Sequence, residues 1–209
     1  MRRYIAIPGI HGELRKLKSL LSKIRTRSDD LFIFLGDYID RGPKSKEVVD
    51  ELIQFSQSHQ CVFLIGAHEY SMLNVKNDDY YKWIFINYGG RATINSYGSF
   101  ENIMKVHGDF YNNLNLYCYT QDYFFVHAGI NPHYTLDDQD EYDLLYIGWN
   151  FIDSPHNLPQ KIIFGHTDFE SPYIMHDKIG INLGCGIYPH APLCALILDN
   201  GKEKFVYSD

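Results

Sequence analysis

The stretch LFIFLGDYIDRG, residues 31–42, joins an apolar run to a turn that carries two aspartates and an arginine. The run at 31–35 is continuously apolar, which is typical of a strand buried on both faces. Asp37, Asp40 and Arg41 follow it directly. Open α/β sheets bind their ligands at the carboxyl ends of the strands. The stretch therefore predicts both a central buried strand and a polar site at its end.

The sequence on either side of this stretch alternates between strands and helices. Apolar runs at 3–7 and 61–65 predict two further strands. Periodic apolar residues predict helices over 13–24 and 45–57. This order predicts neighbouring parallel strands that are joined by right-handed crossovers.

The remainder of the chain has a different pattern. Residues 71–113 are expected to be helical, with an interruption at NYGGRATINSYG, residues 87–98. Apolar runs in the last third predict strands at 116–120, 123–129, 161–167, 172–184, 192–199 and 204–208. Parallel units followed by a strand-rich half predict an α/β fold in which two packed mixed sheets are flanked by helices.

Length and composition are those of an ordinary globular protein. The 209 residues, 45% hydrophobic and 22% charged, are expected to form a single domain over 1–209. The formal net charge of −7 argues against an extended nucleic-acid surface. No apolar run is long enough to span a membrane. The 4 cysteines are scattered without a CxxC pair, which indicates reduced thiols and a cytoplasmic location.

Polar residues gather at the ends of five of the predicted strands. Each of these turns has a glycine beside or near the polar residue, which lets the backbone approach a ligand closely. The residues are His11, Asp37, Asp40, Arg41, His68, His127 and His166. One histidine at a strand end is more often structural, but four of these turns share the histidine, and the fifth supplies two aspartates and an arginine, which indicates a common site.

The chemistry that these side chains can perform together is narrow. Histidines and aspartates without cysteine suit divalent metals such as zinc, manganese or iron. Asp37 can bridge two ions, and two bridged ions can activate a water and clamp an oxygen of a phosphoester. Arg41 offers a planar fork that fits a phosphate. His68 could protonate the departing alkoxide, with Asp40 fixing its orientation, so the set predicts phosphoester hydrolysis.

These motifs also resemble those of a known family. In their order and rough spacing the chain resembles the phosphoprotein-phosphatase group of calcineurin-like metallophosphoesterases. Within this group it most resembles short bacterial serine/threonine phosphatases and symmetrical diadenosine-tetraphosphatase-like proteins. The family signature runs GDxHG, GDxxDRG, GNHE, HAG and GH, and GDYIDRG matches its second motif fully. The resemblance implies a four-layer αββα fold, a dimetal site between the sheets, and a phosphoprotein or dinucleoside polyphosphate as the phosphorylated substrate or ligand.

The chain departs from the family pattern at three positions. Gly9 stands where the family has a metal-binding aspartate, and Ala67 stands where it has a metal-binding asparagine. Gly148, in DLLYIGWNF, stands where bacterial members often carry a second phosphate-binding arginine. The departures therefore leave fewer ligands for the implied metal ions and fewer contacts for the phosphate.

Counting ligands by this analogy predicts a reduced metal site. The family's first metal would keep only His11 and Asp37, which is too few for a firm site. The second would keep Asp37, His127 and His166, and two histidines with a carboxylate can hold a catalytic zinc. Alternatively, His11 could swing in to complete one four-coordinate site. We expect one tightly bound divalent ion (Mn, Zn or Fe) rather than two.

Two functions are compatible with this pattern. In the first, the protein is a phosphoester hydrolase, phosphatase-like or diadenosine-tetraphosphatase-like, with weak or lost activity, and retention of His68, Asp40 and Arg41 favours it. In the second, it is an inactive pseudophosphatase that binds a phospho-ligand or a protein, and the ligand losses favour that. Engineering of Gly9 and Ala67 to trap a substrate is a less favoured third explanation.

Two further residues near these motifs have structural interpretations. Glu69 follows His68 and is expected to cap the next helix, where a carboxylate is favoured by the helix dipole. Arg91, in the GGRAT segment, is expected at the surface rather than at the site.

Overall fold

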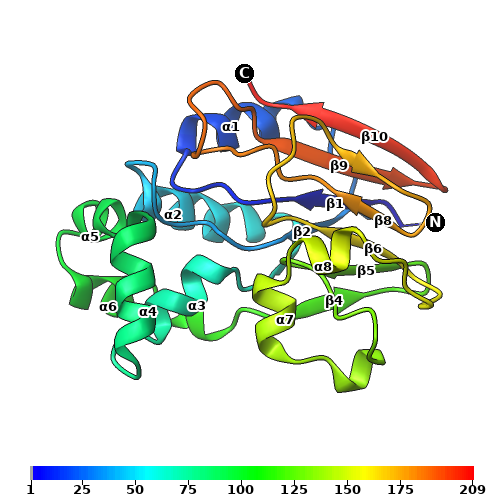
Figure 1. Cartoon of the computed structure of the whole chain (residues 1–209). Helices are drawn as coiled ribbons and strands as arrows, with labels where there is room; N and C mark the ends of the chain where they lie inside the picture. Colours follow the sequence, from blue (N-terminus) through cyan, green and yellow to red (C-terminus); the bar gives the residue numbers. More distant parts are fainter. Residues whose placement is uncertain (1) are drawn as a thin grey trace.

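The computed structural model describes residues 2–209 and forms two sheets that pack against each other between helices (Figure 1). The first sheet contains, in spatial order, β10 (Lys202–Tyr207), β9 (Cys194–Asp199), β1 (Tyr4–Ile7), β2 (Leu31–Phe34) and β3 (Gln60–Phe63). The second contains β4 (Tyr117–Tyr119), β5 (Tyr123–Val126), β6 (Lys161–Phe164), β8 (Lys178–Gly180) and β7 (Tyr173–Ile174).

Both sheets are mixed, as the sequence predicts. In the first, β1, β2 and β3 are parallel, while β9 and β10 run antiparallel to them. In the second, β5, β6 and β8 are parallel, and the edge strands β4 and β7 are antiparallel to their neighbours. The expected β-α-β-α-β unit at the start of the chain is confirmed.

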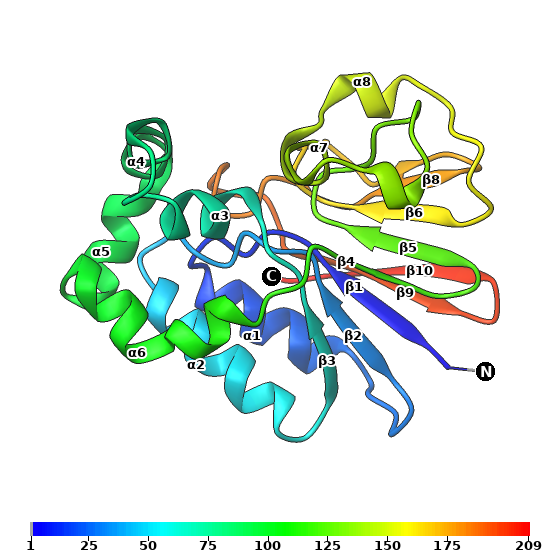
Figure 2. The same cartoon turned by 90° about the horizontal axis from the view of Figure 1, so that it is seen from below.

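Helices cover the outer face of each sheet (Figure 2). α1 (Leu14–Lys23) and α2 (Ser45–Ser56) lie on the first sheet, and α7 (Glu141–Tyr146) and α8 (Trp149–Ile152) lie on the second. The segment between β3 and β4 forms α3 (Ala67–Leu73), α4 (Asp79–Phe85), a π-helical turn (Ile86–Gly90), α5 (Arg91–Tyr97) and α6 (Phe100–Asn112). No helix within 2–209 has the length and hydropathy needed to cross a membrane.

Strand alternation explains why the central runs are continuously apolar. In β1, Ile5 and Ile7 pack with the outer helices, whereas Ala6 belongs to the core between the sheets. In β6, Ile163 faces that same inner core, while Phe164 packs with α7 and α8. Because each sheet is covered on both faces, no position in these strands is left for a polar side chain until the strand ends.

The last third differs from the predicted strands in two places. The run 172–184 is not one strand: it forms the short β7–β8 hairpin, in which the Met175 N–H donates to the Lys178 carbonyl (2.9 Å), and then a loop. The short helices α7 and α8 were not predicted. α7 is only six residues long, and its two core leucines are too few to reveal a helical period. Its clearest signal is Asp140, whose side chain caps the Tyr142 N–H.

Candidate functional site

The loops after β1, β2, β5 and β6 and the first turn of α3 meet at one place and bring all seven candidate residues together. His127 Nε2 and His11 Nε2 lie 3.5 Å and 3.8 Å from Asp37 Oδ2. The rings of His127 and His166 are 5.0 Å apart between centroids. The remaining members, Asp40, Arg41 and His68, line a cavity that also contains His166.

Backbone conformation singles out the same residues independently. Within 2–209, six residues other than glycine have positive φ, and five of them belong to the candidate set. They are His11 (49°), Asp37 (56°), Asp40 (71°), Arg41 (65°) and His166 (57°). The left-handed region is unfavourable for residues with a Cβ, and such strain is concentrated at functional sites. The sixth, Asn200, is in the β9–β10 hairpin turn, where asparagine tolerates this conformation.

Asp37, His127 and His166 form a group that fits a divalent cation. Their donor atoms lie within 4.8 Å of one another; Asp37 and His127 are buried and His166 is half-buried. His127 Nδ1 donates to the Leu35 carbonyl (2.6 Å), which fixes the orientation of the ring. His127 Nε2 is buried and has no hydrogen-bond partner. A buried unsatisfied nitrogen is costly by itself, whereas a metal-ligating histidine commonly has its other nitrogen fixed in this way.

The pKa values of His166, His11 and Asp37 are shifted in the directions that favour cation binding. Burial lowers the pKa of His166 to about 4, and burial together with neighbouring His68 lowers the pKa of His11 to about 3. Burial opposes ionisation of Asp37, but the surrounding histidines, led by His127, hold its pKa below the usual range. Neutral imidazoles and an ionised carboxylate are the forms in which these side chains ligate metals.

Gly9 and Ala67 contribute no donor atoms to the site. A Cβ on Gly9 would lie 3.2 Å from His11 Nε2 and 3.3 Å from Asp37 Cβ, so this backbone position adjoins both side chains. Ala67 is buried at the start of α3, beside His68. His11, Asp37 and His68 also place donor atoms within 4.8 Å of one another, as a second group around the shared carboxylate.

His68 is held by a chain of hydrogen bonds. Its Nδ1 lies 2.7 Å from Asp40 Oδ2, and Asp40 Oδ1 accepts the hydroxyl of Thr93 at 2.5 Å. The Thr93 hydroxyl in turn accepts from the Asp40 N–H (2.9 Å). Burial lowers the pKa of His68, but Asp37 and Asp40 outweigh it and raise that pKa above the ordinary value. Thr93 was missed from the sequence, although it lies in the NYGGRATINSYG segment, residues 87–98.

Glu69 caps α3 as expected, and it also shapes the loop that presents Asp37. Its carboxylate accepts the Gly66 N–H (3.1 Å), which is the capping contact. It also accepts the N–H groups of Asp37 (2.8 Å), Tyr38 (2.8 Å) and Ile39 (3.2 Å). Glu69 is fully buried, and burial raises its pKa to about 7. One side chain therefore ties the two loops that carry Asp37 and His68.

Replacing Glu69 should destabilise the protein strongly. The Glu69→Ala variant leaves four buried N–H groups without their acceptor, and each costs about 1–3 kcal/mol when unsatisfied. We expect the free energy of unfolding, measured by urea denaturation, to fall by about 3 kcal/mol or more. The exposed Glu170→Ala is the control, with an expected change within about 0.5 kcal/mol. Equal effects of the two substitutions would contradict this role of Glu69.

Arg41 is available to bind an anion. Its Nε is buried without a hydrogen-bond partner, and its guanidinium has no ion pair with a carboxylate of the described chain. The Arg41 N–H donates to the Gly89 carbonyl (3.3 Å), which fixes the backbone. Arg91 is exposed, as expected, and is not among the residues that line the cavity. A Cβ on Gly148 would meet nothing within 4 Å, so the fold leaves room for a side chain there.

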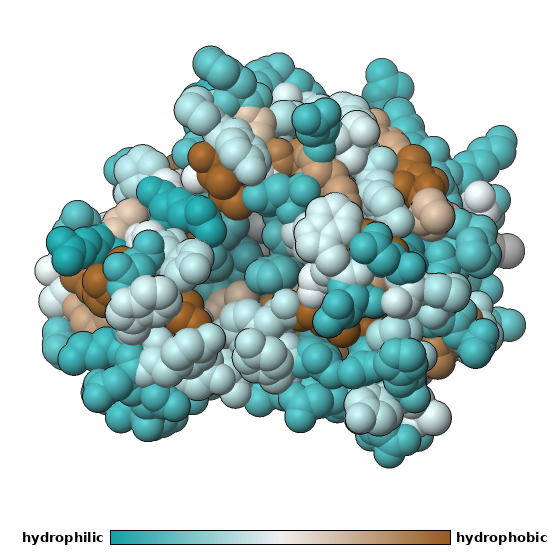
Figure 3. Space-filling model, viewed as in Figure 1, coloured by the Kyte–Doolittle hydropathy of each residue, from teal (hydrophilic) through white to brown (hydrophobic). Residues whose placement is uncertain are grey.

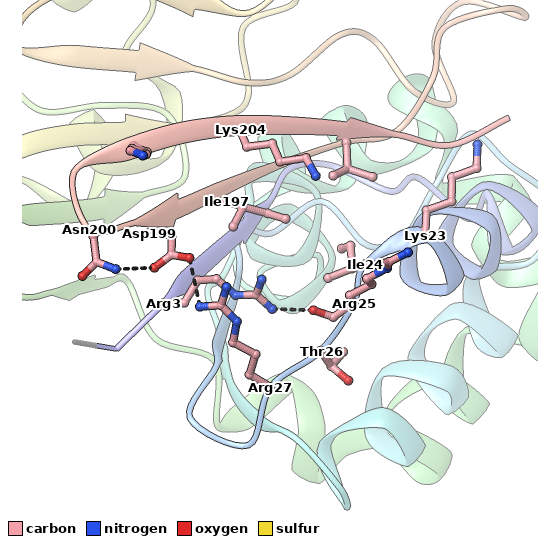
Figure 4. Close-up of a pocket in the computed structure, with 12 residues that line it drawn as sticks. Arg3, Lys23, Ile24, Arg25, Thr26, Arg27, Ile197, Asp199, Asn200 and Lys204 are labelled. Atoms are coloured by element: carbon pink, nitrogen blue, oxygen red, sulfur yellow. Dashed lines mark hydrogen bonds and ion pairs between the residues drawn. The ribbon is translucent and has the colours of Figure 1, made fainter.

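The site opens on the face of the molecule shown in Figure 3, which has a hydrophilic hollow next to α3. The cavity there measures about 280 Å³. A separate cavity of about 750 Å³ lies between α1 and β9–β10 and is lined by several cations (Figure 4). Its Arg3 pairs with Asp30 (2.6 Å) and its Arg27 with Asp199 (2.9 Å), so these guanidinium groups are already neutralised. It contains none of the seven candidate residues.

Comparison with known proteins agrees with the fold and the motifs. The profile of the calcineurin-like phosphoesterase family matches residues 4–202. An asymmetrical bis(5'-nucleosyl)-tetraphosphatase of Anoxybacillus flavithermus is 25% identical over 178 residues, which cover 73% of this chain and 69% of the relative. The same enzyme of Oceanobacillus iheyensis is 22% identical over 210 residues, covering 86% of this chain and 82% of the relative. Both relatives carry the asymmetrical designation, whereas the motifs suggested the symmetrical type.

Solved structures share the fold over the whole chain. A candidate diadenosine tetraphosphatase superposes with a TM-score of 0.75 at 18% identity, over 100% of this chain and 94% of that one. A cold-active protein-tyrosine phosphatase of a psychrophilic Shewanella species gives 0.74 at 16% identity, over 100% of this chain and 81% of that one. At these identities the likeness establishes the arrangement of sheets and helices and nothing finer.

Proposed function

Because this chain belongs to the calcineurin-like phosphoesterase family, we propose that it is a metal-dependent phosphoester hydrolase whose activity is weak or lost. One observation carries the proposal: the group formed by Asp37, His127 and His166 lies beside the His68–Asp40 pair. The names of the relatives suggest two substrate classes, dinucleoside polyphosphates and phosphoproteins. Either class would present a phosphoryl group to the same side chains.

Each side chain has a distinct part in this proposal. Asp37, His127 and His166 would hold the ion, with His11 as a further ligand. A divalent ion held there would polarise a phosphoryl oxygen and lower the pKa of a bound water. Arg41 binds the remaining phosphoryl oxygens through its planar fork.

Proton donation to the leaving group falls to His68 in this proposal. Its Nδ1 is occupied by Asp40, which leaves Nε2 free to deliver a proton to the departing oxygen. Asp40 acts as a positioning residue, because it fixes the ring and is itself fixed by Thr93.

Weak activity in this proposal follows from the missing donors. The family pattern would place a carboxylate at Gly9 and an amide at Ala67, and neither is present. Gly9 adjoins His11 and Asp37, so the loss falls on the ion that those two residues would share. We infer one tightly held ion at most.

A pseudophosphatase that binds a phospho-ligand or a protein is the second candidate function. The specific observation in its favour is the pattern of losses at Gly9, Ala67 and Gly148. Two of these remove metal donors, yet Arg41 keeps an unsatisfied guanidinium nitrogen at the cavity. Such a site would still attract a phosphate without turning it over.

A phosphatase assay with added manganese separates these candidates. Wild type is compared with a Gly9→Asp, Ala67→Asn variant under the same conditions. Slow turnover by wild type supports the hydrolase, and turnover by the variant alone supports the pseudophosphatase. If neither protein hydrolyses any phosphoester, the hydrolase proposal is wrong. If both proteins are equally fast, the claim that the missing donors at Gly9 and Ala67 weaken the activity is wrong.

A further inference from the structure

The rim of the candidate site carries aromatic side chains that the proposed reaction does not use. The lining of the 280 Å³ cavity includes the polar side chains of Asp40, Arg41, His68 and His166. The same cavity is also lined by Tyr80, Trp83, Ile84, Phe85, Tyr88 and Tyr146. We call Tyr80, Trp83, Tyr88 and Tyr146 the aromatic wall.

Three rings of the aromatic wall are exposed rather than packed in the core. Tyr80, Trp83 and Tyr88 are 51%, 57% and 50% exposed, and all come from α4 and the π-helical turn that follows it. The rings of Trp83 and Tyr88 stand edge to face, with centroids 6.2 Å apart. Exposed apolar groups gathered around one opening mark a binding surface more often than scattered ones do.

The aromatic wall is tied directly to Arg41. The π-helical turn contains Gly89, whose carbonyl accepts the Arg41 N–H at 3.3 Å. Gly89 has a φ of +112°, and a Cβ there would lie 2.5 Å from the Arg41 nitrogen. The two backbones therefore touch, and Arg41 lines the same cavity as the aromatic wall. The ring of Tyr146 stands at 90° to that of His166, with the centroids 6.3 Å apart.

We propose that the aromatic wall holds the base of a nucleoside phosphate whose phosphoryl group lies on Arg41. The inference rests on the proposed function, because the proposed function places the phosphoryl group on Arg41. A flat base stacks favourably on an aromatic side chain, whichever base it is. The tyrosine hydroxyls and the Trp83 indole N–H can also bond to the polar edge of a base, which the phenyl ring of a phosphotyrosine lacks.

The size of the cavity favours one base rather than a whole dinucleoside. Ligand clefts usually measure about 300–1,000 Å³, and this cavity lies just below that range. A dinucleoside polyphosphate would place one nucleoside against the aromatic wall and extend the other into solvent.

Binding to metal-free protein tests this inference without any turnover. The protein is kept in chelator and titrated calorimetrically with AMP, with ribose 5-phosphate and with phenyl phosphate. We expect AMP to bind about tenfold or more tightly than ribose 5-phosphate, and Trp83→Leu to remove that difference. Trp149→Leu is the matched control, because Trp149 is 59% exposed but lies on α8 away from the cavity lining.

A fluorescence measurement supplies an independent readout. The chain has 2 tryptophans, so in the Trp149→Leu variant the emission comes from Trp83 alone. AMP should change that emission, and ribose 5-phosphate should not.

The outcomes separate failure of this inference from failure of the proposed function. Equal affinities for AMP and ribose 5-phosphate, or equal effects of the two tryptophan substitutions, would overturn the base site whatever the activity. Phenyl phosphate binding as tightly as AMP would overturn it too, in favour of an aryl phosphate. Selective AMP binding by a protein that hydrolyses no phosphoester would leave the base site standing and refute the hydrolase.

Discussion

The Gly9→Asp, Ala67→Asn variant is expected to hydrolyse a phosphomonoester at least about 100-fold faster than wild type when manganese is present, as measured by kcat/KM. Clamping by two ions contributes several kcal/mol to transition-state stabilisation, and each 1.36 kcal/mol corresponds to a tenfold change in rate. By the family analogy, the carboxylate at position 9 restores a donor to the ion of His11 and Asp37, and the amide at position 67 restores one to the ion of Asp37, His127 and His166. A gain of about 3 kcal/mol gives the 100-fold figure.

The local geometry permits this repair. Gly9 does not have a positive φ, so a residue with a Cβ can adopt its conformation. The Cβ would lie 3.2 Å from His11 Nε2, so the imidazole must shift by a few tenths of an ångström. That neighbour is the end of a side chain and not backbone, and a ligand that moves toward an ion can make the shift.

Matched controls separate the donor atoms from the added volume. Gly9→Ala adds the Cβ without a carboxylate, and Ala67→Leu has the shape of asparagine without its amide. Both controls should remain as slow as wild type. An increase in the controls as large as in the repaired variant would show that packing, rather than metal ligation, limits the rate.

Loss of His68 should have the second large effect. In the repaired variant, His68→Asn is expected to lower kcat by about 100- to 10,000-fold, which is the range for a general acid. The loss should be large for an alkyl phosphate and small for p-nitrophenyl phosphate, whose leaving group needs no proton. The exposed His133→Asn should change neither rate.

Metal content decides whether His68 acts as a proton donor or as a ligand. Its donor atom lies within 4.8 Å of those of His11 and Asp37, so ligation has to be tested. We expect the His68→Asn variant to retain as much bound metal as its parent. A loss of metal together with an equal rate loss for both substrates would assign His68 to the metal site instead.

Most of the architecture could be predicted because the fold buries its strands on both faces. Continuous apolar runs such as 31–35 have few other interpretations, and the helices between them have a clear period. The prediction failed where elements are short and depend on tertiary contacts. The run 172–184 was predicted as one strand because apolar residues lie on both sides of the turn at Met175–Lys178. The helix α7 contributes only Leu144 and Leu145 to the core.

The candidate residues could be predicted because each follows a strand, and strand ends are easily located. Their supporting contacts could not. Thr93 reaches Asp40 across 53 positions of sequence, and Glu69 reaches the N–H of Asp37 across 32. Nothing in the local sequence distinguishes these side chains from an ordinary helix residue and an ordinary cap. The aromatic wall could not be predicted either, because composition does not distinguish exposed aromatic residues such as Tyr80 and Trp83 from aromatic residues of the core.

The metal content of the wild-type protein, purified without chelator, tests the central claim most directly. Inductively coupled plasma mass spectrometry of wild type should give at most one manganese, zinc or iron per chain, held by Asp37, His127 and His166. The Gly9→Asp, Ala67→Asn variant should bind two. Two stoichiometric ions in wild type would contradict the account, because the missing donors at Gly9 and Ala67 would then not have reduced metal binding.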